Sequence, residues 1–420
     1  VCFCDASTGE ISATVLRGAN QQSKLLSELG TYAPREVLFN LPRDRESAVA
    51  NFVTGRLNAV LGDAQGDRYL YPDARARVEA QFGDSLRAGV LEQKALVGAV
   101  GALLSYLGEM QKTDLAVIKE LRVYNEGQYL GMDLNTRRNL ELTETMRGKE
   151  KKGTLLWVLD KTKTAMGGRM LRSWLEKPLL DAAQIGRRHS AVEELVSSTI
   201  ARGELEQALK GVTDLERVMT RIVTGSVNCR DLLGLANGFR ALPLVKAQLA
   251  QMESPLLARL EQAIDPLNDC ADLIDNTIAE KPPLTVREGG IIREGADPEA
   301  DRLRDIMDGG KDIIASIEAS EKEKTGIRTL KVSFNRVFGY YIEVSKSFMD
   351  QVPGHYIRKQ TLANCERYIT QELKELEEQV LTAKDRLTAL EYQIFTQLRE
   401  HLAQQAARVQ LTASAVASAD

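Results

Sequence analysis

Long hydrophobic runs and an excess of positive charge are both missing from this sequence of 420 residues. No stretch approaches the 18 or so apolar residues that a membrane-spanning helix needs, so the sequence predicts no membrane contact. The formal net charge is -4, from 55 basic and 59 acidic residues. This balance excludes a protein coated in positive charge, and any contact with nucleic acid must therefore be local.

Cysteine and histidine are also scarce. The five cysteines are scattered except for Cys2 and Cys4, and the three histidines lie far apart in the sequence. Because neither a second cysteine pair nor a histidine cluster completes a zinc set, we expect no metal site and a reduced, cytosolic chain. The chain opens inside a strand-like run, "VCFCDASTGEISATVL", so we expect it to be a piece of a longer protein.

The sequence also lacks the Gly-x-x-x-x-Gly-Lys-[Ser/Thr] loop that holds nucleotide phosphates. The Gly167-Gly168 pair in "TAMGGRMLRSWL" has no lysine and hydroxyl after it. The spacing of Met166, Met170 and Trp174, together with Leu171, instead predicts the packed face of a helix. We therefore expect no nucleotide cofactor in this chain, and no enzymatic activity of its own.

One acidic residue could suggest metal-dependent nuclease chemistry. The stretch "CFCDASTGE" places Asp5 at the end of a first strand, where ribonuclease H-like nucleases hold a metal-binding carboxylate. Two-metal chemistry needs several converging carboxylates, and no second motif accompanies this one. A hairpin turn is the favoured interpretation, and the nuclease is the weakest of three functional hypotheses.

At this length the chain is too long for one compact core, and the pattern of apolar residues changes along the sequence. Residues 1–115 mix short apolar runs with amphipathic helix signals, a pattern that predicts an α/β domain. Residues 116–298 repeat apolar positions every three or four residues, with Pro, Gly and Asn between the repeats. This second segment predicts an all-helical body.

Two long helical runs follow. Apolar residues are spaced by three and four from Leu303 to Ile317, and again from Leu373 to Leu398. The second run contains no Pro or Gly after Glu366, so it predicts a helix of about 40 residues, roughly 60 Å long. The spacing indicates two antiparallel helices that pack along their length.

Between these runs, residues 328–368 predict a small β module with a turn at Pro353-Gly354. The module has seven Lys or Arg against three acids, a local balance of +4, and seven of the 22 aromatic residues. Basic side chains beside a helix N-terminus suit phosphate binding, and Asn364 is the expected N-cap of the returning helix. The alternative is that the aromatic residues fill a small core and the basic groups form a solvated face.

Four stretches resemble, in order, the MutS family of DNA mismatch repair proteins. They are "LLWVLDKTKTAMGGRMLRSWLEKPLLD", "EGGIIREGADPEADRLR", "VFGYYIEVSKS" and "YIRKQTLANCERYITQELKELE". The resemblance spans essentially the whole chain and implies a multidomain, mainly α fold. Its parts would be a ribonuclease H-like α/β connector (1–115), a helical core (116–298), a first lever helix (299–327), a β-rich clamp (328–368) and a returning lever helix (369–420).

The resemblance implies that the clamp contacts the backbone of double-stranded DNA. The residues to which this role carries over are Asn335, Arg336, Arg358, Lys359, Thr361, Asn364 and Arg367. The chain departs from the family at Ala363, where a basic residue is usual, and at Gln371, where a proline is usual. The first departure leaves one phosphate contact of the clamp without its usual side chain.

Further expectations follow from the same resemblance. The connector would dock a MutL-type protein, and the lever helices would couple the clamp to an ATPase that lies outside this chain, as does the mismatch-reading domain. ATP and Mg²⁺ would belong to the full-length family only, self-association would be weak without the ATPase domain, and the location would be the bacterial cytoplasm, at the nucleoid. The alternative, from a different class, is a coiled-coil scaffold whose β tip binds another protein.

Overall fold

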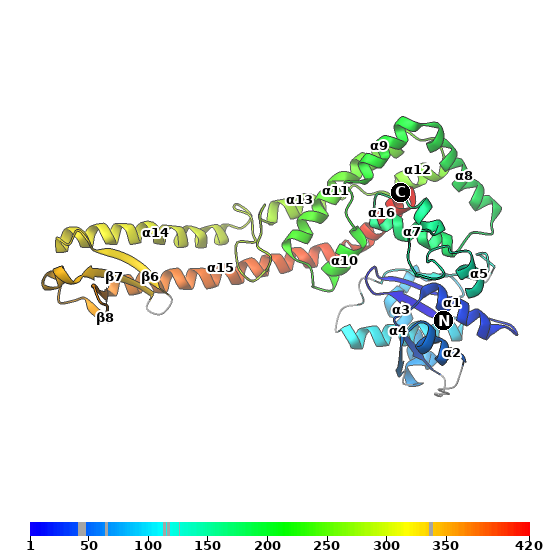
Figure 1. The fold of residues 1–420 in the computed structure, drawn as a ribbon, viewed down its shortest axis with the longest axis horizontal. Helices are drawn as coiled ribbons and strands as arrows, with labels where there is room; N and C mark the ends of the chain where they lie inside the picture. The colour runs from blue at the N-terminus through cyan, green and yellow to red at the C-terminus, as the bar shows by residue number, and fades with distance from the viewer. Residues whose placement is uncertain (41–47, 64–65, 112–114, 116–117, 126, 336–338) are drawn as a thin grey trace. The chain divides into compact units, whose positions relative to one another are not determined.

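A computed structural model describes residues 1–40, 48–63, 66–111, 115, 118–125, 127–335 and 339–420 (Figure 1). The chain forms two compact units. The first unit consists of residues 1–227, 231–274 and 399–420, and the second unit of residues 228–230 and 275–398. Within the described residues, no helix is both long enough and apolar enough to cross a membrane.

The first unit begins with two small sheets. Strands β1 (Cys2–Asp5) and β2 (Glu10–Ala13) form an antiparallel hairpin, and β5 (Leu121–Val123) pairs in parallel with β2. Strands β3 (Glu36–Phe39) and β4 (Val60–Asp63) form a separate parallel pair. The helical elements of this part are α1 (Gln21–Tyr32), α2 (Ala48–Asn51), η1 (Phe52–Arg56), η2 (Gly66–Tyr69), α3 (Tyr71–Phe82), η3 (Gly83–Ser85) and α4 (Lys94–Gln111).

Asp5 forms part of the hairpin turn between β1 and β2. The backbone N–H and the hydroxyl of Ser7 donate to Asp5 Oδ1 at 2.8 and 2.7 Å. Gly9, which closes the turn, has φ = 74°, a conformation that glycine adopts without strain. The prediction of a hairpin turn is confirmed, and the Asp5 carboxylate is occupied in forming it.

Helices α3 and α4 pack against each other unusually closely. A Cβ atom at Gly101 of α4 would lie 2.5 Å from the Cβ of Ala74 in α3, well inside van der Waals contact. Val78, Leu96 and Val97 are fully buried around this crossing. Glycine at position 101 therefore sets how near the two helices can approach.

Replacing Gly101 by Ala should lower the free energy of unfolding by about 1–3 kcal/mol, because the added methyl group forces the two helices apart. The measurement is urea denaturation followed by circular dichroism. Gly108→Ala is the matched control, because Gly108 lies in the same helix with nothing within 4 Å of its added Cβ. If the two variants lose stability equally, the close crossing is not what position 101 requires.

The rest of the first unit is helical. Its helices are α5 (Leu134–Asn139), α6 (Leu155–Leu159), α7 (Ala165–Glu176), α8 (Ala182–Ser197), α9 (Thr199–Leu209), α10 (Leu215–Val223), α11 (Cys229–Leu249), α12 (Pro255–Ala263), α13 (Asn268–Thr277) and α16 (Ala406–Ala419). Side-chain oxygens of Thr154, Thr164, Asp181 and Asp214 accept hydrogen bonds at four helix N-termini. These caps satisfy backbone donors that a helix start leaves unpaired, and they explain where the helices begin.

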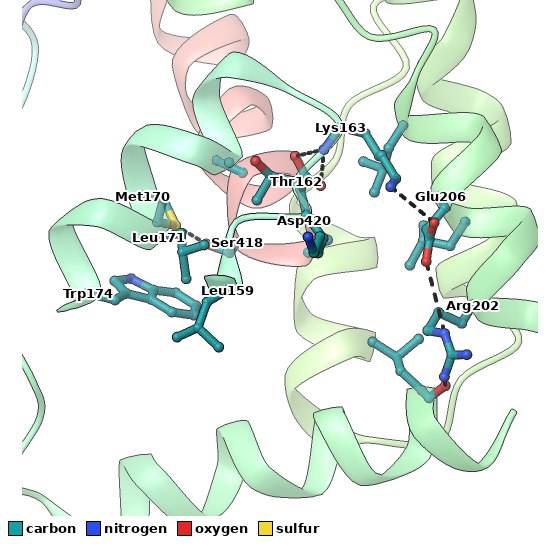
Figure 2. Close-up of a pocket in the computed structure, with 17 residues that line it drawn as sticks. Leu159, Thr162, Lys163, Met170, Leu171, Trp174, Arg202, Glu206, Ser418 and Asp420 are labelled. Atoms are coloured by element: carbon teal, nitrogen blue, oxygen red, sulfur yellow. Dashed lines mark hydrogen bonds and ion pairs between the residues drawn. The ribbon is translucent and has the colours of Figure 1, made fainter. Parts of the chain in front are cut away.

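Near the start of α7 the structure explains the Gly167-Gly168 pair. The carboxylate of Asp420 accepts from the backbone N–H groups of Lys163 and Thr164, each at 2.8 Å (Figure 2). A side chain at Gly167 would overlap this carboxylate. The predicted helix face is partly confirmed: Met166 is buried, whereas Met170, Leu171 and Trp174 line a pocket of about 270 Å³.

Lys177 connects the helical part of the first unit to its α/β part. The ammonium group lies 2.5 Å from the hydroxyl of Tyr32, 3.9 Å from the centre of that ring and 4.4 Å from the centre of the Tyr124 ring. The Tyr124 hydroxyl in turn donates to Glu28 at 2.6 Å. Burial lowers the pKa of Lys177 to about 8, since the charged form loses hydration in this site.

This lowered pKa predicts a specific pH dependence. The unfolded chain holds the Lys177 proton up to about pH 10.4, whereas the folded chain releases it near pH 8, so stability should rise between these values by about 3 kcal/mol, of which about 2 kcal/mol falls between pH 7.5 and 9.5. Urea denaturation at pH 7.5, 8.5 and 9.5 measures the rise. Lys177→Met, which cannot titrate, should remove most of it; an identical rise in this variant would show that another group is responsible.

The second unit contains two long helices and one sheet. Helix α14 (Pro298–Thr325) leads into strands β6 (Lys331–Asn335) and β7 (Gly339–Ser345), helix η5 (Lys346–Gln351), strands β8 (Ile357–Thr361) and β9 (Cys365–Ile369), and then α15 (Gln371–Gln404). The sheet is antiparallel, in the order β6-β7-β9-β8. Helices α14 and α15 lie side by side (Figure 1). Ala300 and Leu303 of α14 pack with Ala383 and Leu387 of α15.

The sequence prediction was wrong about both ends of the second long helix. Asn364 is not its N-cap, because β9 continues to Ile369 and pairs with both neighbouring strands. The Thr370 hydroxyl instead accepts from the backbone N–H of Leu373 at 3.3 Å. The helix is also not continuous to the end of the described chain: α15 ends at Gln404 and α16 starts after Gln405.

A buried carboxylate joins α15 to the glycine-rich turn before α14. Gly289 and Gly290 have positive φ angles of 82° and 73°, which glycine adopts without strain. Their conformation directs the Gly290 N–H to Glu391 Oε2 at 2.5 Å, and the Ile291 N–H points to the same oxygen at 3.2 Å. Arg304 of α14 donates to the other carboxylate oxygen at 2.9 Å, and Glu391 is fully buried.

Candidate nucleic-acid interface

The sheet of the second unit turns one face toward the two long helices. Ile342, Val344 and Tyr368 form this inner face and pack against Ile317 of α14 and Leu373 of α15. Side chains alternate between the two faces along a strand, and directly paired residues on neighbouring strands share a face. The pairing therefore assigns the paired strand residues to the inner or the outer face.

The inner face holds a buried carboxylate at the end of the sheet. Glu366 is 2% exposed and accepts from the Tyr368 hydroxyl at 2.6 Å, the Thr361 hydroxyl at 3.1 Å and the Arg358 guanidinium at 3.4 Å. The hydrogen bond from Tyr368 holds the pKa of Glu366 below its usual value. Burial, and secondarily this carboxylate, raises the pKa of Tyr368 to about 12. Glu366 therefore stays charged and orients Arg358 and Thr361.

Arg358 keeps most of its guanidinium available. It pairs with Glu366 through one nitrogen only, and 63% of its side chain is exposed. Lys359 follows it at an irregularity of the edge strand β8, between Arg358 and Gln360, and is also exposed. These two adjacent cations lie on a strand edge that is open to a partner.

Arg367 has a different environment from Arg358. Its side chain is only 22% exposed, and it donates to Glu343 at 3.2 Å and to Gln360 at 3.0 Å while its guanidinium lies 4.4 Å from the Tyr341 ring. Arg358 is paired with Tyr368 and Arg367 with Gln360, so the two arginines lie on opposite faces of the sheet. The structure brings Arg358, Lys359 and Thr361 together and separates Arg367 from them.

The remaining predicted residues lie at two strand ends. Asn335 is the last residue of β6, and Arg336 falls outside the described residues. Asn364 is exposed in the turn between β8 and β9, and its carbonyl accepts from the backbone N–H of Lys346 at 3.1 Å. The contact places Lys346, an exposed cation, beside this turn. Sequence reasoning counted Lys346 as part of the basic segment but did not select it, because only the fold brings it next to Asn364.

Two tyrosines form the support beneath these groups. Tyr356 and Tyr368 are 7% and 6% exposed, with ring centres 5.9 Å apart. The Tyr356 hydroxyl donates to Glu321 of α14, which also accepts from Lys324 at 2.8 Å. Packing of the aromatic residues into a small core is thus confirmed, while the side chains of Arg358 and Lys359 stay exposed. Glu321 was not visible as a support from sequence, because its partner is 35 residues away.

Comparison with known families defines the class of protein to which this architecture belongs. Residues 1–119 match the family model for MutS domain II, and residues 135–420 match that for MutS domain III. The chain therefore belongs to the MutS family of DNA mismatch repair proteins. Both the family and the multidomain, mainly α fold predicted from the sequence are confirmed.

Individual relatives show the extent of the similarity. The chain is 44% identical over 416 residues to the DNA mismatch repair protein MutS of Ruminiclostridium cellulolyticum, covering 99% of this chain and 48% of that protein. It is 44% identical over 421 residues to that of Symbiobacterium thermophilum (99% and 48%), and 40% identical over 421 residues to that of Clostridium tetani (100% and 47%). The chain spans about half the length of the curated relatives it matches.

Proposed function

We propose that this chain is the DNA-binding central part of a mismatch repair protein, and that the sheet of the second unit contacts the duplex backbone. The observation that carries the proposal is the pair of exposed cations, Arg358 and Lys359, on the open edge strand β8. Lys346 and Asn364 add donors at the adjacent turn. Guanidinium and ammonium groups on a fixed backbone are the usual partners of phosphate oxygens.

Contacts of this kind predict binding that depends on salt but not on base sequence. The test is the affinity for one duplex, matched or carrying a single mismatch, at 50 and 200 mM salt. The proposal expects similar affinities for both duplexes and a marked loss at high salt, because cations that neutralise phosphates release counterions. Undetectable binding to both duplexes at 50 mM salt would contradict it.

A coiled-coil scaffold whose sheet binds another protein is the second candidate function. It is favoured by two exposed apolar side chains on the two edge strands, Phe334 of β6 (52% exposed) and Ile357 of β8 (57% exposed). Exposed apolar groups on a sheet edge are typical of protein contacts. Replacing both by Ser should leave DNA affinity unchanged if DNA is the ligand of the sheet.

We also propose that the chain neither binds nor hydrolyses ATP, because the sequence has no phosphate-holding loop with its lysine. Isothermal titration with ATP and Mg²⁺ should therefore give no binding heat at micromolar concentrations. A coupling of the long helices to nucleotide state would then require an ATPase outside this chain. Detectable nucleotide binding would overturn this part of the proposal.

A MutL-type protein is the partner proposed for the α/β part of the first unit, and self-association of the chain is proposed to be weak. Analytical ultracentrifugation of the whole chain, alone and with the MutL-type protein, tests both statements. A complex that forms only when duplex DNA is added would show that the docking surface is composite. A stable dimer of the chain alone would contradict weak self-association.

A further inference from the structure

We propose that residues 145–153 of the first unit, called the basic loop below, form a second contact site for the DNA backbone. This inference rests on the proposed function, since it assumes that duplex DNA is the ligand. It places a contact outside the sheet of the second unit, in the loop that precedes α6. The site consists of cations held on a hydrogen-bonded loop.

The charge of the basic loop is concentrated and largely unpaired. It contains Arg147, Lys149, Lys151 and Lys152 against one acid, Glu150. Lys151 is the cation with an internal role: it pairs with Asp160 at 2.5 Å and holds the pKa of that carboxyl below its usual value. The other three basic side chains are exposed and form no ion pair with any residue that the structure describes.

Backbone hydrogen bonds fix the shape of the basic loop. The N–H of Lys149 donates to the Thr145 carbonyl at 3.1 Å, and the N–H of Thr145 donates to the Glu150 carbonyl at 3.0 Å. The Thr145 hydroxyl also accepts from the Glu150 N–H at 3.1 Å. Lys149 has φ = 50°, an uncommon conformation for a residue with a side chain. The loop therefore presents its cations from one defined backbone arrangement.

Backbone hydrogen bonds also close the base of the basic loop. The N–H groups of Leu155 and Leu156 donate to the carbonyls of Glu141 and Leu142, at 3.2 and 2.9 Å. The Met146 N–H donates to the Glu141 carboxylate at 2.6 Å. A compact loop with tied ends loses little conformational freedom on binding, so its three free cations can meet phosphates at low entropic cost.

A protein partner is the competing explanation, because α6 exposes Leu155, Trp157 and Val158 beside the loop. The arrangement of the basic loop favours DNA. Phosphate contacts require unpaired cations on a fixed scaffold, which the loop supplies, and they require no matching apolar surface. The loop itself exposes three free cations within six residues, a density of charge that a polyanion neutralises most completely.

The test uses the whole chain and a fluorescently labelled 30-base-pair duplex, with binding followed by anisotropy at two salt concentrations. Arg147→Glu, Lys149→Glu and Lys152→Glu should each weaken binding about 3- to 10-fold at low salt, and each should reduce the log–log salt slope by roughly 0.9. Glu150→Gln, which removes the one acid of the loop, should strengthen binding. A purely structural role of the loop predicts no such gain.

Lys210→Glu is the matched control, since it reverses one exposed lysine at the C-terminus of α9, outside the loop sequence. Circular dichroism and thermal melting show whether each variant is folded. If folded loop variants keep full DNA affinity while Arg358 and Lys359 variants lose it, the inference is wrong and the proposed function stands. If neither set changes the affinity, both are wrong. Loop variants that bind DNA normally but lose a MutL-type protein would reassign the loop to a protein partner and overturn the proposal.

Discussion

Replacing Glu391 by Ala is expected to lower the free energy of unfolding by about 3–5 kcal/mol. The carboxylate is fully buried, and it is the acceptor for the Gly290 and Ile291 N–H groups and for Arg304. Removing it leaves two backbone donors and one guanidinium without a partner in the interior, and each unpaired donor carries a desolvation cost. Urea denaturation followed by circular dichroism measures the loss.

The control for this prediction is Glu378→Ala, which removes an exposed glutamate from the same helix. A surface change of this kind should alter stability by no more than about 0.5 kcal/mol. Glu391→Gln is a second informative variant, because it keeps the volume and one carbonyl oxygen but loses the charge that faces Arg304. An unfolding free energy close to that of the original protein in Glu391→Ala would show that the glycine turn does not depend on this carboxylate.

The double replacement of Arg358 and Lys359 by Ala is expected to weaken duplex binding about 10- to 100-fold at low salt, for matched and mismatched DNA alike. Both side chains are exposed on one edge strand, and each removed phosphate contact should lower the log–log salt slope by roughly 0.9. Anisotropy with both duplexes provides the measurement. Ala363→Arg, a change to a basic residue at the exposed turn, should strengthen binding in the same sequence-independent way.

Arg367→Ala separates a structural role from a binding role. Its guanidinium already binds Glu343 and Gln360 over the Tyr341 ring, so its loss should lower the melting temperature of the chain. Arg358→Ala should leave the melting temperature nearly unchanged, since most of that side chain is in solvent. A folded Arg358→Ala, Lys359→Ala double variant with full affinity and an unchanged salt slope would remove the sheet from the DNA interface and favour the scaffold.

Local patterns in the sequence predicted the elements of this fold well. Apolar spacings of three and four identify the helices that carry Leu303 and Leu387, because helix periodicity appears directly in the order of residues. The Asp5 turn was also predictable, since it depends on backbone chemistry within a few residues. The resemblance to the MutS family then indicated how these elements group into larger parts of the chain.

Contacts between distant residues explain what the sequence could not reveal. Asn364 has the chemistry of an N-cap, but pairing of β9 with β7 and β8 extends the strand past it, so tertiary structure overrides local preference. Arg358 and Arg367 are both basic and lie nine positions apart, and only the folded structure shows that one is mostly exposed while the other is held by Glu343. The roles of Glu321, Glu366 and Glu391 as buried hydrogen-bond acceptors were likewise not visible in the sequence, because only the structure shows their donors.

The discontinuous first unit has a consequence for synthesis on the ribosome. Its last helix, α16, buries Ala406, Val409, Ala413 and Val416 and packs against α7, α10 and α12, which are all made much earlier. Residues 275–398 of the second unit are translated in between, which takes roughly 6–25 s at about 5–20 residues per second. During this interval the surfaces of α7, α10 and α12 that α16 will cover remain uncovered. The first unit therefore cannot complete its packing until residues 406–419 have been made.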